Sequence, residues 1–437
     1  MIAGLENPDD LAAEAGPKVA LPARYIAALL IANLAMYVAW IAPVYFSMAI
    51  RLEQINPAHK TTALALAVGI PSFVVMLTGP LLGVISDRTK SRLGRRRFWF
   101  LLGTLCGFAG SLIVGLAHSI AVVIPAWTAA FIGYASASGM LGTHLGDRLP
   151  EAQRGRVSGL NSAVTSIGPV IGIVIAGRFT SVPLLMLIIP AIIALAGGLF
   201  FSVVMNDPLP ESEPGGVEMK AILDGFWFDP RKHRSYAWVW LSRAFVYLSI
   251  SFTSVYAVYL LSARLHIPDG MLANRIATAG LVGLPAGVFG ALASGWVSDR
   301  LKSRKPFLVI SAIVMAISAL VTATLTSLPQ YYAGVLIGAL GIGAYGATDA
   351  ALVLDVLPQE ENQNGRYLAL IGLANALPMA TGPFLAGFVI KLAHGDYTWV
   401  YYDAAMFAVI GALLILPVRY VWRETKPAEV NELAAQP

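Results

Sequence analysis

The sequence predicts an all-α integral membrane protein with about twelve transmembrane helices. The first observation is composition: among 437 residues, 57% are hydrophobic and only 13% are charged, with a mean hydropathy of +0.70. An ordinary soluble domain carries about 25% charged residues. The second observation is that long apolar runs recur along the whole chain. These runs are about twice the length that a membrane β-strand needs, so they indicate helices.

Each predicted span is an apolar run of about 20 residues bounded by charged or turn-forming residues. The third and fourth spans are separated only by a short connection at His118 and Ser119. The predicted spans are 25–50, 61–86, 98–118, 120–142, 157–177, 183–205, 236–262, 276–297, 307–327, 330–353, 367–390 and 398–420.

The charged residues outside the spans predict the orientation. Residues 1–24 are acidic and contain no apolar signal-peptide core, so we expect them to form a tail. Most of the 30 Lys and Arg residues fall in the tails and in alternate loops, which predicts that both termini are cytoplasmic in a cytoplasmic membrane. Because these basic residues are spread over short segments, the net charge of +5 does not indicate nucleic-acid binding.

The sequence contains little that would support catalysis. Cys106 is the one cysteine, and none of the six histidines forms a metal-spaced pair. There is no phosphate-binding loop and no Gly-x-Ser-x-Gly motif. We therefore expect neither a metal nor a cofactor, and no enzyme activity.

Three short motifs of the first half recur about 210 residues later in the second half. Each copy falls at the same place in its half, and six helices separate the copies. Because six is an even number, the two halves are predicted to be parallel repeats. The predicted organisation is a tail (1–24), a six-helix bundle (25–205), a cytoplasmic linker (206–235) with one interfacial helix around 217–228, a second bundle (236–420) and a tail (421–437). The paired motifs are 83–92 and 295–304, 147–156 and 355–366, and 161–169 and 375–383.

One of these motifs carries a family resemblance. The segment SDRTKSRLGRRR at residues 86–97 resembles the loop signature of the major facilitator superfamily, and its spacing is similar to that of the sucrose/proton and glycoside-pentoside-hexuronide symporters. Phe98 departs from the proline usual in the sugar branch, whereas the second copy has Pro306. The resemblance implies the major facilitator fold and secondary transport of a small-molecule substrate by alternating access. One chain would already hold both halves, so we expect a working monomer in the lipid bilayer. A channel or a membrane receptor is the alternative from another class.

The loop motif is interpreted as a gate. Glycine would allow a close helix approach, and an aspartate can face the positive N-terminus of another helix. In the superfamily this partner is helix 11, which would begin near Arg366 here. The alternative is that the basic residues only set topology. The predicted gating residues are Gly83, Asp87, Arg88, Arg95, Asp299, Arg300 and Arg366.

The resemblance also implies that helices 1, 4, 7 and 10 line the substrate cavity. On helix 7, Arg243, Tyr247 and Ser251 recur at helical spacing. An intramembrane arginine indicates a functional site and needs a partner, for which we nominate Asp349 on helix 10, one turn from Tyr345. The alternative is that Arg243 extends its charge to the membrane surface.

Helices 1 and 4 supply aromatic and polar candidates. Asn33, Tyr37 and Trp40 share one face of helix 1, and Trp127 and Tyr134 lie on helix 4. Aromatic ring faces with hydrogen-bonding groups suit a sugar or glycoside, although ordinary packing would explain each aromatic residue as well.

The coupling ion is not determined by the sequence. Helices 1–6 contain no internal Asp or Glu, so Asp349 is the best proton carrier for symport. A uniporter and an efflux protein working by proton antiport are the alternatives. In the superfamily, proton-driven drug efflux proteins typically carry an arginine within helix 4. This helix has no basic residue between Ser119 and Thr143, which argues against efflux.

Overall fold

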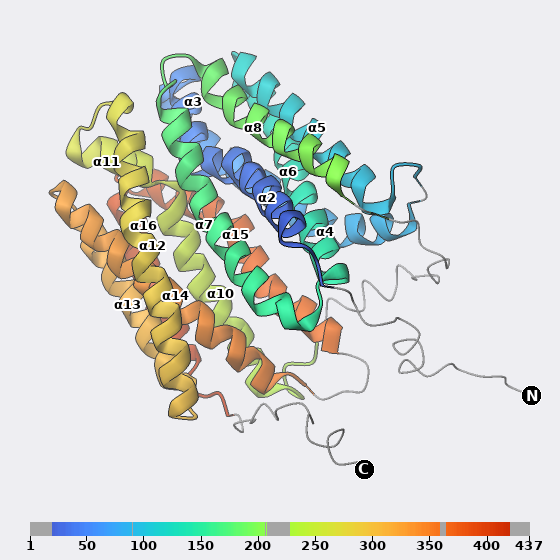
Figure 1. Cartoon of the computed structure of the whole chain (residues 1–437). Coiled ribbons are helices and arrows are strands. Elements are labelled where there is room, and N and C mark those ends of the chain that lie inside the picture. The colour runs from blue at the N-terminus through green and yellow to red at the C-terminus, as the bar shows by residue number, and fades with distance from the viewer. Residues whose placement is uncertain (1–19, 90, 206, 208–227, 359–363, 420–437) are drawn as a thin grey trace, which may run out of the picture. The chain divides into compact units, whose positions relative to one another are not determined.

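The computed structural model describes residues 20–89, 91–205, 207, 228–358 and 364–419 (Figure 1). Throughout these residues the regular structure is helical, and the described part of the chain contains no β-strand. This confirms the predicted all-α class. The interfacial helix predicted around 217–228 falls outside the described residues except for Phe228.

The helices follow one another along the chain with short connections. In the first half of the chain they are α2 (Ala23–Ala42), η1 (Pro43–Ser47), α3 (Met48–Ile55), η2 (Pro57–His59), α4 (Lys60–Arg88), α5 (Arg95–Leu116), α6 (Ile120–Arg148), α7 (Glu151–Gly177) and α8 (Pro183–Val204). In the second half they are α10 (Arg234–Val255), α11 (Ala257–Leu265), α12 (Asp269–Arg300), α13 (Lys305–Ala323), α14 (Leu328–Val356), α15 (Asn364–Leu392) and α16 (Thr398–Leu414).

Ten helical spans among the described residues are long and apolar enough to cross a membrane. An eleventh is the pair α10 and α11, which is bent by 51° at Tyr256. The apolar helix α16, with 17 residues, occupies the position predicted for the twelfth span. The chain is therefore a multi-pass membrane protein.

The first predicted span differs at its end. It was expected to stop at residue 50, but the helix continues as a π-turn over Pro43–Ser47 and then as α3 to Ile55. A proline removes one backbone donor and excludes the normal hydrogen bond four residues back, and a π-turn accommodates both effects. The extension places Arg51 inside the helix.

The described chain groups into two compact units, and each is described here by itself. Unit 1 contains residues 1–216, 254–281 and 380–397, and unit 2 contains 217–253, 282–379 and 398–437. Unit 1 thus includes segments that follow the linker in sequence. The division into halves at 25–205 and 236–420 stays a prediction from the sequence.

Unit 1 is built around α2, which packs against α6, α7 and α8, while α5 packs against α6 and α8. Small residues bring α5 and α6 together: a Cβ added to Gly103 would lie 2.5 Å from the carbonyl oxygen of Gly133. Such contacts hold membrane helices together by close packing, because no hydrophobic force acts between helices in lipid.

In unit 2, α13 packs against α14 and α16. The helices α12 and α14 meet at Gly290, where an added Cβ would lie 2.3 Å from the carbonyl oxygen of Leu340. Helix α10 is joined to α16 by a hydrogen bond from the Ser242 hydroxyl to the carbonyl of Gly411 (2.6 Å).

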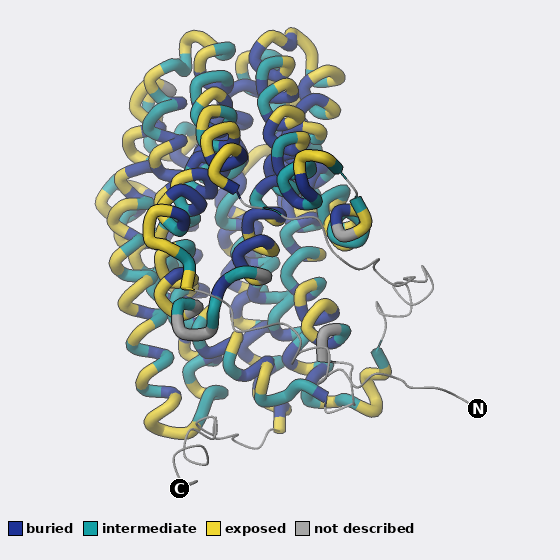
Figure 2. The backbone as a smooth tube through the Cα atoms, turned by 45° about the vertical axis from the view of Figure 1, so that its right-hand side comes forward, coloured by how far each residue is buried: buried dark blue, intermediate teal, exposed yellow. Residues whose placement is uncertain are grey.

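Both units carry exposed large apolar residues. Figure 2 colours every exposed residue yellow. Val203 in unit 1 and Phe289, Leu292 and Trp296 in unit 2 are each more than 60% exposed. Contiguous apolar surface of this kind is unfavourable in water but is the normal outer face of a helix in lipid.

Candidate functional site

In unit 1, the predicted residue Asn33 is buried and is at the centre of a partly buried polar network. The Asn33 amide donates to Oδ1 of Asn161 on α7 (2.7 Å), and its own Oδ1 accepts from the Ser138 hydroxyl on α6 (3.0 Å). Ser138 is also a hydrogen-bond partner of Tyr37. The network therefore joins α2, α6 and α7, and it uses both functional groups of the Asn33 amide.

Aromatic rings continue this surface along α2 and α6. The ring centroids of Tyr37 and Trp40 are 5.5 Å apart, those of Trp40 and Phe131 are 5.4 Å apart, and those of Trp127 and Phe131 are 6.1 Å apart. The indole nitrogens of Trp40 and Trp127 are buried and have no hydrogen-bond partner among the described residues. We call Asn33, Tyr37, Trp40, Trp127 and Phe131 the aromatic face.

Tyr134 lies elsewhere on α6. Its ring is packed against Gly107 of α5, where an added Cβ would come within 2.4 Å of the ring, and its hydroxyl is bonded to that of Ser111 (3.1 Å). The hydroxyl is thus already used in packing α5 against α6. We leave Tyr134 out of the proposed substrate contacts.

In unit 2, Arg243 and Asp349 form an ion pair with 2.6 Å between Nη1 and Oδ2. This confirms the predicted pairing. The Asp349 side chain is 4% exposed and that of Arg243 is 15% exposed. A mostly buried ion pair is costly unless both charges are well partnered, so we treat this pair as a candidate functional site rather than as a source of stability.

The other predicted residues of unit 2 surround this pair. The Arg243 guanidinium lies 5.3 Å from the Tyr247 ring centroid, and Tyr345, one turn before Asp349, is buried and is a hydrogen-bond partner of its carboxylate. Nε of Arg243 and the hydroxyl of Ser251 are buried and have no partner among the described residues. We call Arg243, Tyr247, Tyr345 and Asp349 the ion-pair cluster.

The first copy of the loop motif is described only in part. The side chain of Asp87 lies outside the described residues. Arg88 is exposed, and Arg95 is half-buried at the start of α5. An added Cβ at Gly83 would meet no described atom within 4 Å, so the structure gives no support to the close helix approach expected there.

The second copy is more fully described. Asp299 is paired with Arg304, whose Nε also lies 3.5 Å from the Asp355 carboxylate. Arg300 is exposed and stacks on Trp296, 5.4 Å from its ring centroid. At the start of α15, Arg366 lies 5.7 Å from the ring centroid of Tyr367.

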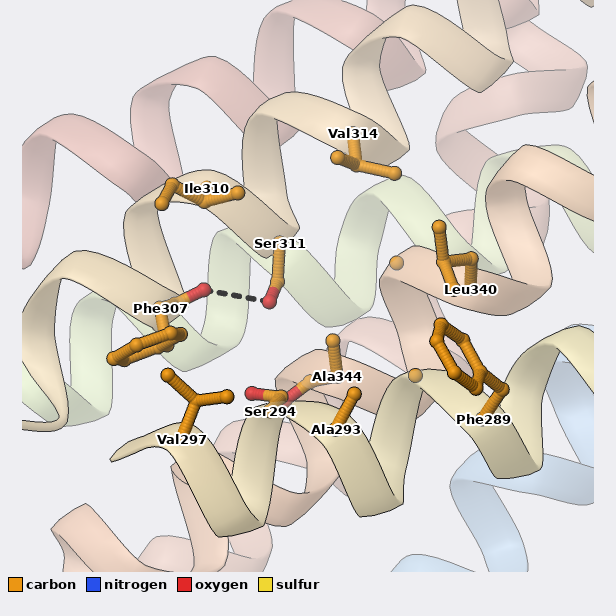
Figure 3. A pocket seen from close by; sticks show the side chains of 12 residues that line it. Phe289, Ala293, Ser294, Val297, Phe307, Ile310, Ser311, Val314, Leu340 and Ala344 are labelled. Atoms are coloured by element: carbon orange, nitrogen blue, oxygen red, sulfur yellow. Dashed lines mark hydrogen bonds between the residues drawn. The ribbon is translucent and has the colours of Figure 1, made fainter. Parts of the chain in front are cut away.

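Unit 2 also contains a groove between α12, α13 and α14, shown in Figure 3. Its volume is about 240 Å³ and its walls are apolar. The hydroxyl of Ser311 donates to the Phe307 carbonyl (2.6 Å) and that of Ser294 to the Ala344 carbonyl (3.1 Å), so neither has a donor left for a polar solute. The groove residues are Phe289, Gly290, Ala293, Ser294, Val297, Phe307, Ile310, Ser311, Val314, Leu340, Gly341 and Ala344.

Comparison with known families identifies the fold. The sequence profile of the Major Facilitator Superfamily matches residues 26–361 and 239–436, which together cover most of the chain. The chain belongs to the Major Facilitator Superfamily. It is therefore a membrane transporter and not an enzyme.

Solved structures of other superfamily transporters share this fold. A mutant form of the nucleoside transporter NupG matches with a TM-score of 0.75 and 12% identity, over 90% of this chain and 99% of that one. A D-xylose-proton symporter matches with a TM-score of 0.66 and 16% identity, over 91% and 98%. A bacterial homolog of the human lysosomal transporter Spinster, in an inward-facing and unoccupied conformation, matches with a TM-score of 0.64 and 15% identity, over 90% and 95%. No curated protein matches the sequence significantly.

Unit 1 of this superfamily member includes contacts between segments that are far apart in the sequence. A Cβ added to Gly69 of α4 would lie 2.3 Å from the Phe384 ring of α15, and one added to Gly177, at the end of α7, would lie 2.0 Å from Ala273 of α12. These contacts lie at the end of the bundle that the charge pattern predicts to be external. At that end, parts of α11, α12 and α15 pack directly against helices that precede the linker in sequence.

Two tyrosines form a polar latch within this contact region. The Tyr259 hydroxyl of α11 donates to the carbonyl of Ala49 (2.9 Å), and the hydroxyls of Tyr397 and Thr61 are 2.9 Å apart. The Lys60 ammonium lies 4.8 Å from the Tyr259 ring centroid. A tyrosine hydroxyl is protonated at neutral pH, and burial raises the pKa of Tyr397 further. We call Ala49, Lys60, Thr61, Tyr259 and Tyr397 the external latch.

Sequence reasoning missed several of these residues. Asn161, inside α7, and Arg304, directly before α13, both belong to repeated motifs, and this repetition of polar residues is the signal that could assign them. Arg51 was placed in a loop because the first span was ended too early. The latch tyrosines carried no sequence signal, since isolated tyrosines at helix ends are common in membrane proteins.

Proposed function

We propose that this transporter moves a small, neutral, hydroxyl-bearing solute, a sugar or glycoside, across the cytoplasmic membrane by alternating access, with both termini in the cytoplasm. The single observation that carries the substrate class is the aromatic face. There, two buried indole N–H groups lack partners beside the rings of Tyr37 and Phe131.

The physical argument concerns unsatisfied donors. A buried N–H without a partner is unfavourable, and native structures keep few of them. A solute oxygen that accepts from Trp40 or Trp127 removes that cost, and the apolar face of a sugar ring packs on an aromatic ring. Hydroxyl groups of the solute supply the acceptors, so a polyhydroxylated ring fits this surface better than an apolar drug.

A nucleoside is the second candidate. Its base would stack on the same rings, and its ribose would offer hydroxyl acceptors to the indole groups. The structural likeness to the nucleoside transporter NupG, with a TM-score of 0.75, favours including this class, although the likeness itself extends to the fold alone. Competition between a sugar and uridine distinguishes the two candidates.

The ion-pair cluster is our candidate for coupling. Protonation of Asp349 would cancel its charge and release Arg243, so a proton and a conformational change would be linked at one buried site. The closed packing at the predicted external end supports alternating access, since a transporter of this kind must close one end at a time. One chain carries both repeats, and we propose that it works as a monomer.

The test is uptake into proteoliposomes that contain the purified protein. Radiolabelled sucrose, maltose, glucose and uridine are supplied with and without an inward proton gradient. Accumulation driven by the gradient is the expected result, whereas equilibration that ignores the gradient would indicate a uniporter. If none of the four solutes enters, the sugar and nucleoside proposals both fail, and efflux substrates become the next class to test.

The coupling proposal has its own variant, Asp349→Asn. We expect this change to abolish gradient-driven accumulation while exchange of labelled for unlabelled solute continues, because an amide cannot carry the proton. Asp229→Asn, at an exposed position before α10, is the matched control and should accumulate normally. Normal accumulation by Asp349→Asn would show that the coupling proton binds elsewhere.

A further inference from the structure

The beginning of α5 is capped by a residue from a distant part of unit 1. One carboxylate oxygen of Asp207, just beyond the end of α8, accepts hydrogen bonds from the backbone N–H groups of Arg96 (2.6 Å) and Arg97 (2.9 Å). The first N–H groups of a helix have no partner within it, and a negative charge is stabilising there. Asp207 therefore does for α5 what the side chain of the N-cap residue does in most helices.

Gly94 makes this arrangement possible. It is the N-cap residue of α5 and has no side chain that could cap the helix. Its φ of +102° is a conformation that favours glycine. A Cβ added to Gly94 would lie 2.6 Å from the carboxylate of Asp207 and 2.8 Å from its carbonyl oxygen. The loop before α5 therefore leaves the capping to Asp207 and leaves no space for another side chain at position 94.

The other end of the loop between α4 and α5 is also attached. The indole N–H of Trp99 on α5 donates to the Thr89 hydroxyl (2.7 Å), and this hydroxyl donates to the carbonyl of Ile85 in the last turn of α4 (2.8 Å). Between the two attachments, Arg92 is exposed. The loop that contains the predicted gate motif is thus bonded to α4 and α5 at one end and to Asp207 at the other.

We propose that Asp207 is a positioning residue for transport, which holds the α4–α5 loop in the place from which it can close the cytoplasmic end. The proposal rests on alternating access and on the interpretation of the loop motif as a gate. Because Asp207 follows α8, its hydrogen bonds keep the loop and the end of α8 in one relative position. A loop without this attachment closes less readily, so conformations in which the external end is open become less populated.

Hydrogen–deuterium exchange of the full-length protein, measured by mass spectrometry on peptides covering residues 91–100, tests the attachment. Asp207→Ala removes the acceptor, and we expect this segment to exchange about fivefold faster, which is the usual effect of losing an N-cap. Asp207→Asn keeps an acceptor oxygen and should exchange within twofold of the unchanged protein. The matched control is Asp229→Ala, since the Asp229 carboxylate also accepts from a backbone N–H, that of Arg231 (2.8 Å), at the other end of the linker.

A second measurement tests the effect on opening and needs no transported solute. Ala65 is buried beside Gly387 at the predicted external end. A cysteine introduced by Ala65→Cys, in a Cys106→Ser background, therefore reports opening of that end when it is labelled by a membrane-impermeant maleimide. We expect Asp207→Ala to slow this labelling at least threefold, whereas Asp207→Asn and Asp229→Ala should label at the background rate.

Gly94→Ala tests the same attachment from the side of the loop. Its methyl group would collide with Asp207 and would require an unfavourable φ. We therefore expect both faster exchange and slower labelling, as in Asp207→Ala. Thermal unfolding of each variant in detergent shows whether it is folded.

Unchanged exchange in the folded Asp207→Ala protein would overturn the proposal, because the carboxylate would not be holding the beginning of α5. Faster exchange with unchanged labelling would also overturn it, since Asp207 would then be a helix cap with no effect on opening. Neither readout uses a solute, so a failure of the uptake test for sugars and nucleosides is distinguishable from a failure of this proposal.

Discussion

At the scale of single residues, the best candidates for substrate contacts are buried polar groups that lack a hydrogen-bond partner in the structure. In the polar network of unit 1, both groups of the Asn33 amide have partners, so this residue is fixed. The indole N–H groups of Trp40 and Trp127 are buried without one. A hydrogen bond from a ligand contributes most to binding where it satisfies a buried donor that has no other partner. We therefore expect substitutions of the two tryptophans to change substrate affinity more directly than substitutions of Asn33.

Trp40→Phe removes the indole donor and keeps an aromatic ring. Because one neutral hydrogen bond contributes about 0.5–1.5 kcal/mol, we expect KM for the transported solute to rise about threefold to tenfold with little change in maximal rate. Initial-rate uptake measures both values. Trp399→Phe, at an exposed position on α16, should leave KM unchanged, and an unchanged KM in Trp40→Phe as well would remove Trp40 from the substrate contacts.

Arg51 is the opposite case: it is a buried charged residue, and its hydrogen bonds go to backbone carbonyls within the protein. Its guanidinium donates to the carbonyls of Val114, Gly115 and Ala117 at the end of α5. Val114 and Gly115 lie in the last turn of α5, where the backbone carbonyls have no partner within the helix and carry partial negative charge, and Ala117 directly follows the helix. Arg51 therefore caps α5 from α3 and has a structural role.

Arg51→Met keeps the length of the side chain and removes the donors. Hydrogen bonds from charged groups contribute about 1.5–3 kcal/mol, so we expect about 2 kcal/mol of destabilisation, seen as a lower Tm in detergent. Arg178→Met, at an exposed position, provides the comparison. A Tm equal to that of the unchanged protein would mean that water satisfies the α5 carbonyls equally well.

At the scale of elements, helix 7 is broken into α10 and α11 at Tyr256. No proline or glycine lies at the break, and the buried Tyr256 hydroxyl instead donates to the carbonyl of Pro383 on α15 (2.9 Å). Tyr256 thus joins the outer segments of helices 7 and 11. Because α11 also carries Tyr259, the two outer segments are expected to move together when the external latch opens.

Tyr259→Phe removes the hydrogen bond to Ala49 and should favour opening of the external end. Loss of one hydrogen bond is about 1 kcal/mol, which corresponds to roughly a fivefold larger open population. The readout is the rate at which a membrane-impermeant maleimide labels a cysteine introduced by Ala65→Cys, in a Cys106→Ser background. Ala65 is buried beneath Gly387 in the closed contact, so labelling reports opening.

Tyr402→Phe, on the exposed face of α16, is the matched control for loss of a phenol hydroxyl. It should label at the rate of the background protein. Equal labelling of the Tyr259→Phe and Tyr402→Phe proteins would mean that the Tyr259 hydrogen bond does not hold the external end closed.

At the scale of the whole molecule, alternating access requires the closed end to open in every cycle. Ala65 and Gly387 lie close enough to be cross-linked, since a Cβ added to Gly387 would be 3.0 Å from the Ala65 Cβ. With cysteine at both positions and Cys106→Ser, we expect oxidation to stop transport and a reducing agent to restore it. Solute uptake before and after reduction is the measurement.

A second cross-link controls for oxidation itself. A Cβ added to Gly197 of α8 would lie 2.7 Å from Ala35 of α2, and both helices precede the linker in sequence. A disulfide between cysteines at these two positions should leave transport active, because it joins helices expected to move together. If the 65–387 disulfide also leaves transport active, the external contact does not open during the cycle.

Features that depend on one segment of the chain could be predicted from the sequence, whereas contacts between distant segments mostly could not. Long apolar runs predicted the spans correctly to within several residues, because burying each peptide group in lipid forces a helix wherever the chain is apolar for about 20 residues. The pairing of Arg243 with Asp349 was also predictable, since an intramembrane charge needs an opposite charge at a similar depth. The pairing of Arg304 with both Asp299 and Asp355 does not follow from the sequence, because it depends on the end of α14 lying beside the loop between α12 and α13.

The sequence by itself thus determined the class of protein, the spans, the repeated motifs and the charge in the membrane, all of which follow from the solvation of single segments. Only the tertiary structure decided that Tyr134 packs against α5, that Asn161 completes the Asn33 network, and that Tyr259 and Tyr397 close one end of unit 1. Those contacts depend on which helices are neighbours and how each is rotated. Lipid surrounds all apolar helix faces alike, so hydropathy leaves both of these choices open.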